Sequence, residues 1–104
     1  MNKHRAQEEI IAEMLSIIVN KAKKTHIMYK ANLSYTLLCK YLDLLLSSNL
    51  VKYNREDKTY ELTKRGELYL DHYAEYKIVE SALINREAEF DDKRSLLNKM
   101  LGGD

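Results

Sequence analysis

The sequence has no proline and no tryptophan, and only three glycines and one cysteine among its 104 residues. The single cysteine, Cys39, excludes an intrachain disulfide, and without a Cys-x-x-Cys pair the usual zinc-ligand spacing is missing. Because proline and glycine interrupt helices most strongly, their scarcity favours long helices. We expect a mainly α-helical protein without a metal or another cofactor.

Long apolar runs are also absent. No stretch approaches the roughly 20 apolar residues that a membrane span needs, and the first ten residues, MNKHRAQEEI, lack the apolar segment of a signal peptide. We therefore expect a cytoplasmic protein. A chain of this length buries only a modest core, which often gains from a partner.

Charge is distributed unevenly along the chain, although the formal net charge is only +1. Residues 1–65 carry 12 Lys and Arg against 7 Asp and Glu, whereas residues 66–104 carry 5 against 9. This asymmetry predicts a nucleic-acid-binding head followed by an acidic tail. Solvated helix faces alone could also generate part of it.

Local signals predict a helix-turn-helix in the first half of the chain. Residues 5–22 form an amphipathic helix by apolar spacing, and Thr25 is a candidate N-cap for a short second helix over HIMYKA. Asn32 tolerates the left-handed conformation of a tight turn, and Ser34 is a good N-cap for a third helix over residues 35–48. The apolar face of the first helix consists of Ile10, Ile11, Met14, Leu15, Ile17 and Ile18.

The third helix has one apolar and one mixed face. The apolar face consists of Leu38, Tyr41, Leu42 and Leu45. In a DNA-reading helix-turn-helix the second helix of the motif enters the major groove, with its N-terminal residues against the base edges. The candidate DNA contacts are therefore Ser34, Tyr35, Thr36, Cys39 and Lys40. The same residues also fit a merely solvated face, Tyr35 could pack into the core, and Cys39 is interpreted as a packing residue rather than a reactive thiol.

Asn49 stands where the third helix needs a left-handed C-cap. Two short runs with strand-like alternation follow, LVKYN and TYEL, separated by REDK. They predict a β-hairpin. A helix-turn-helix followed by a hairpin is a winged helix, and Arg55 and Lys58 in the hairpin turn are placed to contact phosphate. Glu56 and Asp57 reduce the positive charge of the same turn.

Thr63 is a candidate cap for a last helix that runs to about Met100, over roughly 50 Å. Its residues repeat every seven positions, which predicts a coiled coil. The two sets of the repeat are Tyr69, Tyr76, Leu83, Phe90 and Leu97, and Tyr73, Glu80, Glu87, Arg94 and Leu101. A long solvated helix, or a helical hairpin that turns at Asn85, are the alternatives.

Charges in this repeat predict the direction of pairing. In a parallel dimer Glu80, Glu87 and Arg94 would each face their own copy, whereas an antiparallel dimer centred near residue 85 gives every layer an apolar member. Its layers are Tyr69 with Leu101, Tyr73 with Leu97, Tyr76 with Arg94, Glu80 with Phe90 and Leu83 with Glu87. Arg94 could then lie over the ring of Tyr76.

The segments IMYKANLSYTLLCKYLDLLLSSNLV and YELTKRGELYL resemble the archaeal ten-a family of small winged-helix DNA-binding proteins, over residues 9–75. The resemblance implies a homodimer joined by an antiparallel coiled coil and bound to duplex DNA. It places Ser34, Tyr35 and Lys40 on the DNA-facing helix. It also implies DNA contacts on the wing, at Lys52 as well as at Arg55 and Lys58. The second half of the coil departs from the family through its charged seam.

These observations predict a DNA-binding domain over residues 1–66 and a dimerisation helix over residues 67–104. The protein would act on nucleoid DNA as a transcription regulator or an architectural protein; the alternative is a winged-helix module that binds only protein. The predicted dimer contacts are Tyr69, Tyr73, Tyr76, Leu83, Phe90, Arg94, Leu97 and Leu101. No enzyme is indicated, because no Gly-rich phosphate loop occurs and the three histidines lie far apart, at His4, His26 and His72.

Overall fold

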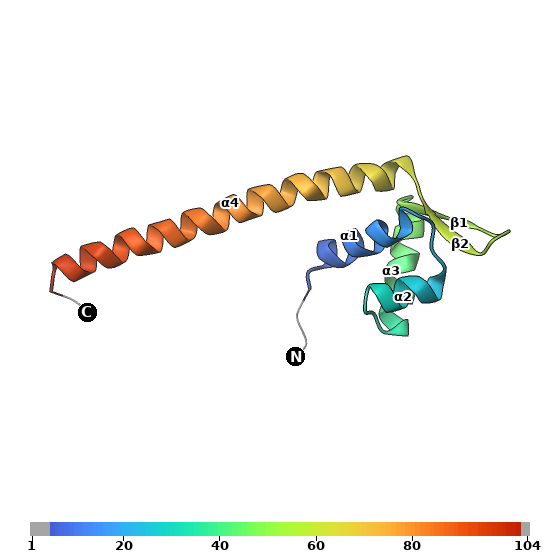
Figure 1. Ribbon diagram of the computed structural model, residues 1–104, viewed down its shortest axis with the longest axis horizontal. Helices are drawn as coiled ribbons and strands as arrows, with labels where there is room; N and C mark the ends of the chain where they lie inside the picture. Colours follow the sequence, from blue (N-terminus) through green and yellow to red (C-terminus); the bar gives the residue numbers. More distant parts are fainter. Residues whose placement is uncertain (1–4, 103–104) are drawn as a thin grey trace. The chain divides into compact units, whose positions relative to one another are not determined.

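The computed structural model describes residues 5–102 and shows the predicted winged helix followed by a long helix (Figure 1). The elements are α1 (Gln7–Ile18), α2 (Lys24–Lys30), α3 (Tyr35–Ser47), β1 (Val51–Asn54), β2 (Thr59–Leu62) and α4 (Lys64–Met100). By its packing the chain divides into two units, and the division falls within α4, between Tyr73 and Ala74. The functional division at residue 66 remains a prediction.

The first unit has a core built from α1, α2, α3 and the hairpin. Its largest fully buried side chains are Met14, Leu15, Ile18, Ile27, Leu38 and Leu45. The predicted apolar face of α3 is confirmed, since its four residues are all buried. Burial of one such side chain stabilises the fold by roughly 1.5–3 kcal/mol, so this core holds the helix-turn-helix in place.

The predicted end of the first helix is wrong, because α1 ends at Ile18 rather than at residue 22. Lys21 adopts a positive φ of 60°, and Ala22 then pairs with Tyr60 of β2 as an isolated bridge. The Tyr60 amide donates to the Ala22 carbonyl at 2.8 Å, and the Ala22 amide donates in return at 3.2 Å. These backbone groups serve the sheet and therefore cannot continue the helix.

The start of the second helix also differs from the prediction. The N-cap is Lys23, and Thr25 lies inside the first turn of α2. Because Ala22 is the residue bridged to the sheet, the helix begins directly after it, two residues earlier than predicted. The Lys23 carbonyl accepts the Ile27 amide at 3.1 Å. The two signals after α2 are confirmed: Asn32 has a φ of 54°, and the Ser34 hydroxyl accepts the Leu37 amide at 3.2 Å.

The predicted hairpin is confirmed as two antiparallel strands, in which Tyr53 lies opposite Tyr60. Asn49, as predicted, has a left-handed φ of 61° where α3 ends, and Lys58 has one of 58° in the hairpin turn. The Asn54 side-chain oxygen accepts the Glu56 amide at 2.9 Å. This contact closes the tip of the wing without a glycine.

The beginning of α4 is bound to the end of α3. Thr63 caps α4 as predicted, because its hydroxyl oxygen accepts the Gly66 amide at 3.0 Å. The same hydroxyl donates to the carbonyl of Asn49, at 2.6 Å, with Leu50 also within reach at 3.0 Å. The helix continues past Asn85 without a break, so the alternative of a helical hairpin at that residue is excluded.

A substitution at Gly66 tests the close packing between the start of α4 and Leu50. A Cβ at residue 66 would lie 2.2 Å from the Leu50 carbonyl oxygen and 2.7 Å from a methyl carbon of Leu62. Because the backbone cannot move aside as a flexible side chain does, we expect Gly66→Ala to lower the free energy of unfolding by about 1–3 kcal/mol. Urea denaturation at matched protein concentration measures the change.

The matched control is Ser81→Ala, on an exposed turn of the same helix. It gains helix propensity and removes no packing, so its stability should equal or slightly exceed that of the wild type. Equal stability of Gly66→Ala and the wild type would contradict the close contact at the junction.

Candidate nucleic-acid interface

The turn between α2 and α3 is held by a residue that precedes α1. The Arg5 guanidinium donates to the carbonyl of Ala31 at 2.8 Å and to that of Asn32 at 3.0 Å, and it also pairs with Glu13. Arg5 thereby satisfies carbonyls that the end of α2 leaves open. Sequence reasoning missed this contact, because an arginine 26 residues from its partner belongs to no local pattern.

The face of α3 that points away from the core carries most of the predicted DNA contacts. Thr36 and Lys40 are exposed there, with Asp43 between them and the end of the helix, whereas Cys39 is only half-exposed. Tyr35 is 63% exposed, which excludes the alternative that it packs into the core. The Ser34 hydroxyl is engaged as the N-cap, so its oxygen is already used by the helix.

Lys24 joins this surface from the first turn of α2. Its ammonium nitrogen lies 3.3 Å from the Tyr35 hydroxyl oxygen and 5.0 Å from the centre of the Tyr35 ring. The hydrogen bond to Tyr35 raises the pKa of Lys24 above its ordinary value of 10.5, so the lysine is charged at neutral pH. Lys24 was not among the predicted DNA contacts, because its position beside Tyr35 depends on how the two helices cross.

The tip of the wing carries two cations, Arg55 and Lys58, for which the described residues provide no ion pair. Glu56 and Asp57 lie between them in sequence. The Thr59 hydroxyl donates to the Asp57 carboxylate at 2.6 Å and lowers the pKa of that carboxyl group. The tip therefore combines cations that can reach phosphate with a carboxylate that stays charged.

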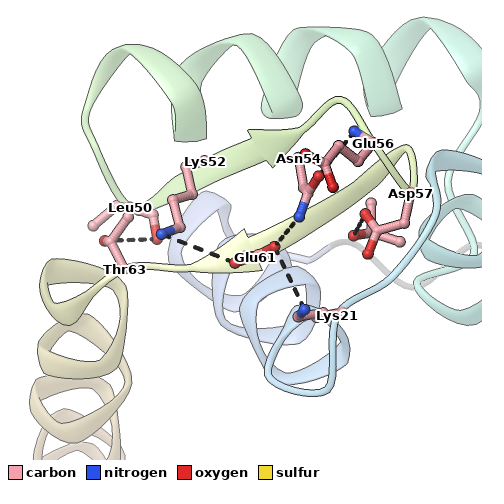
Figure 2. A network of polar contacts seen from close by, with 9 residues as sticks. Lys21, Leu50, Lys52, Asn54, Glu56, Asp57, Glu61 and Thr63 are labelled. Atoms are coloured by element: carbon pink, nitrogen blue, oxygen red, sulfur yellow. Dashed lines mark hydrogen bonds and ion pairs between the residues drawn. The ribbon is translucent and has the colours of Figure 1, made fainter.

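The body of the wing is organised around Glu61, as Figure 2 shows. The Asn54 side-chain amide donates to its carboxylate at 2.9 Å, and the ammonium groups of Lys21 and Lys52 lie 3.7 and 3.9 Å away. The hydrogen bond from Asn54, with help from the two lysines, lowers the pKa of Glu61. Of the three predicted wing cations, Lys52 is thus the one whose charge is shared within the chain.

Two aromatic rings contact each other across the hairpin, and one of them joins the core. The rings of Tyr53 and Tyr60 lie 4.9 Å apart, between centroids, at an angle of 53°. Tyr60 is buried, and this burial raises its pKa above 10.0. Tyr53 is 44% exposed on the opposite strand, so part of its side chain faces solvent.

The second unit is a stretch of α4 whose large apolar side chains are exposed. Those at predicted dimer positions are Tyr76, Leu83, Phe90, Leu97 and Leu101. Arg94 is exposed in the same stretch, and Glu80 pairs with Lys77 at 2.7 Å. Large exposed apolar side chains also occur in this stretch outside the predicted dimer positions, at Ile78, Val79, Ile84 and Leu96.

The first two predicted dimer positions belong to the first unit. Tyr69 is half-buried and packs against the core, and its hydroxyl donates to the Glu8 carbonyl of α1 at 3.5 Å. This burial raises the pKa of Tyr69. Tyr73 is also half-buried. The dimer role of both residues stays a prediction, and Tyr69 has a contact within its own chain besides.

We also examined residues 5–102 for histidine clusters, metal sites and membrane-spanning helices. His26 and His72 lie on different helices, α2 and α4, and His4 lies outside the described residues. In that part of the chain no three His, Cys, Asp or Glu side chains are close enough to hold a metal ion. None of the helices described there is both long and apolar enough to cross a membrane.

Comparison with known proteins identifies similar chains. The model of a family described as winged helix-turn-helix matches residues 4–81. Two proteins of Methanocaldococcus jannaschii, both described only as uncharacterized, are similar in sequence. One is 42% identical over 79 residues, which span 74% of this chain and 79% of the relative. The other is 40% identical over 67 residues, which span 64% of this chain but only 31% of that relative.

Among solved structures, the chain is similar to Sso10a-2, a DNA-binding protein from Sulfolobus solfataricus. The TM-score is 0.76 at 25% identity, and the match covers 85% of this chain and 95% of the other. ZitR of Lactococcus lactis matches with a TM-score of 0.58 at 17% identity, over 98% of this chain and 74% of its own. The second match shows a shared fold only.

The contacts of Glu61 predict a pH dependence of stability. Its partners favour the charged carboxylate, so its pKa in the folded protein lies below the ordinary 4.5. The stabilisation is therefore fully present above pH 4.5 and is lost as the pH falls through the lower, folded-state pKa. We expect the wild type to be more stable than Glu61→Gln at neutral pH, with a difference that shrinks as the pH is lowered below 4.5.

Urea unfolding of both proteins across this pH range measures the difference. Lys52→Met, which removes the most distant of the three partners, serves as a control and should weaken the pH dependence only slightly. A wild-type advantage that stays constant, or grows, on acidification would contradict the role of the Glu61 carboxylate.

Proposed function

Because the chain belongs to the winged helix-turn-helix family, we propose that it binds duplex DNA through α3 and the wing and performs no catalysis. Its archaeal relatives and its match to Sso10a-2 bear out the resemblance to the ten-a family. One observation carries the proposal: Tyr35, Thr36 and Lys40 share the exposed side of a helix held by the same core as the wing.

In the proposed complex the residues divide into two roles. Arg55 and Lys58 contact backbone phosphates, which position the protein but carry no sequence information. Tyr35, Thr36 and Lys40 lie against the edges of bases in the major groove. The protein then acts on nucleoid DNA as a transcription regulator or as an architectural protein. These two roles differ in the ratio of specific to non-specific affinity.

We further propose that the protein is a homodimer joined through α4. The exposed apolar side chains at the repeat positions support this arrangement, since a second copy would cover them; they are Tyr76, Leu83, Phe90 and Leu97. In antiparallel pairing about residue 85, Glu80, Glu87 and Arg94 do not lie opposite the same residues of the partner helix, so like charges do not share a layer. The layers that lie wholly within the second unit are Tyr76 with Arg94, Glu80 with Phe90 and Leu83 with Glu87.

The salt dependence of binding tests the proposed DNA interface. Each neutralised phosphate contributes a slope of about −0.9 to the dependence of log affinity on log salt. We expect Arg55→Ala plus Lys58→Ala to make the slope shallower by about 1 to 2 on every duplex. Fluorescence anisotropy with labelled duplexes at several salt concentrations gives the slopes.

The charge-matched control is Lys93→Ala plus Lys99→Ala, which removes two cations from α4 and should leave the slope unchanged. An unchanged slope in the wing variant would remove the wing tip from the interface. If the wild type binds no duplex even at low salt, the DNA-binding proposal falls, and a protein-binding winged helix is favoured instead.

Cysteine crosslinking tests the direction of the helices in the dimer. In a Cys39→Ser background, one chain carries Tyr76→Cys and a second, longer tagged chain carries Arg94→Cys. In the antiparallel dimer these positions share a layer, so the mixture should form a crosslinked heterodimer on oxidation. Two Arg94→Cys positions would then lie about 27 Å apart along the axis, and Arg94→Cys alone should not crosslink.

A parallel dimer predicts the reverse outcome, because Arg94→Cys would face its own copy. Size-exclusion chromatography before oxidation serves as the control that both variants assemble as the wild type does. Efficient crosslinking of Arg94→Cys alone would refute the antiparallel arrangement, and a monomeric wild type would refute the dimer.

A further inference from the structure

Lys24 and Tyr35 connect the beginnings of the two helices in the helix-turn-helix. Lys24 is the first residue of α2, and Tyr35 is the first residue of α3. The lysine nitrogen lies at the edge of the tyrosine side chain, 3.3 Å from the hydroxyl oxygen and 5.0 Å from the ring centre. The contact is at the surface, beside the helix face proposed to enter the major groove.

Fold stability gives little reason for such a pair. Tyr35 is exposed and Lys24 only half-buried, so water competes for both groups, and surface contacts between a cation and a ring or hydroxyl are correspondingly weak. A lysine ammonium has three protons to donate. One is directed at the Tyr35 hydroxyl, so two remain for another acceptor.

The surroundings of Lys24 leave its charge available. Lys21 and Lys52 both contact the carboxylate of Glu61, whereas no carboxylate in residues 5–102 pairs with Lys24. Its partner is the Tyr35 side chain. The neutral hydroxyl and ring of Tyr35 orient the ammonium group without neutralising its charge. A backbone phosphate is the acceptor that suits an oriented, unneutralised ammonium group beside a DNA-reading helix.

We propose that Lys24 and Tyr35 form one preorganised DNA-contacting unit: Lys24 binds a backbone phosphate and holds the Tyr35 side chain in the orientation that meets a base edge. This inference rests on the proposed DNA-binding function. Long side chains lose rotamer freedom when they are ordered at an interface. A pair that is already ordered in the free protein loses less of it on binding.

A double-mutant cycle tests the unit through Lys24→Ala, Tyr35→Ala and the double variant. Affinities are measured by anisotropy on the duplex that binds best and on an unrelated duplex. We expect each single variant to bind more weakly, and the double variant to bind hardly more weakly than the worse single one. The departure from additivity should be about threefold or more. Lys24→Arg should restore most of the affinity, because arginine keeps the charge and contacts aromatic faces.

Lys23→Ala is the matched control, since Lys23 is the exposed neighbour that precedes α2. Its effect should add to that of Tyr35→Ala without coupling. Thermal unfolding should be nearly the same for all variants, because the substituted side chains lie at the surface.

The outcomes distinguish the Lys24–Tyr35 unit from DNA binding itself. Additive losses for Lys24 and Tyr35, or full affinity of Lys24→Ala, would overturn the unit and leave DNA binding intact. Absence of wild-type binding on every duplex would overturn the unit together with the proposed function.

Discussion

The contact between Thr63 and the end of α3 is the constraint on which the winged-helix unit depends. One hydroxyl reaches the Asn49 carbonyl and accepts the Gly66 amide, so the end of α3, the hairpin and the first turn of α4 meet at one point. Figure 2 shows the Thr63 side chain against Leu50 there. The backbones approach so closely that only glycine fits at residue 66. A loose junction would allow the wing and the recognition helix to move separately.

The electrostatics of the surface divide the cations into two groups. Lys21 and Lys52 are held by Glu61, where they stabilise the hairpin. Arg55, Lys58 and Lys24 have no carboxylate partner among the described residues. A charge that is already paired must be released before it meets a phosphate, whereas an unpaired charge binds directly. The second group therefore supports the proposed interface more strongly than a count of lysines and arginines does.

The two parts of α4 differ in how their apolar side chains are packed. Up to Tyr73 the helix contributes to the core of the winged-helix unit, and Tyr69 serves that core through its ring and its hydroxyl. Beyond Ala74 its apolar side chains have no core to join. The proposed antiparallel dimer accounts for this difference, because its central layers, such as Glu80 with Phe90, take their apolar contacts from a partner helix. The charged members of the seam can extend to water along their stems.

Signals that act within a few residues were determined by the sequence alone. The Ser34 cap, the left-handed Asn32 and Asn49, the apolar face of α3 and the antiparallel hairpin were all predicted, because each depends on neighbours along the chain. The exposed position of Thr36 and Lys40 follows from the same helical periodicity.

Contacts between distant segments were decided only by the tertiary structure. The bridge from Ala22 to Tyr60 ended α1 early and moved the start of α2, and no local preference near residue 22 indicates a partner 38 positions away. The pairing of Lys21 with Glu61, the contact of Arg5 with the turn and the contact of Lys24 with Tyr35 arise in the same way. Each of these contacts forms only when the core brings the two elements together, and the packing of the whole unit determines which elements meet.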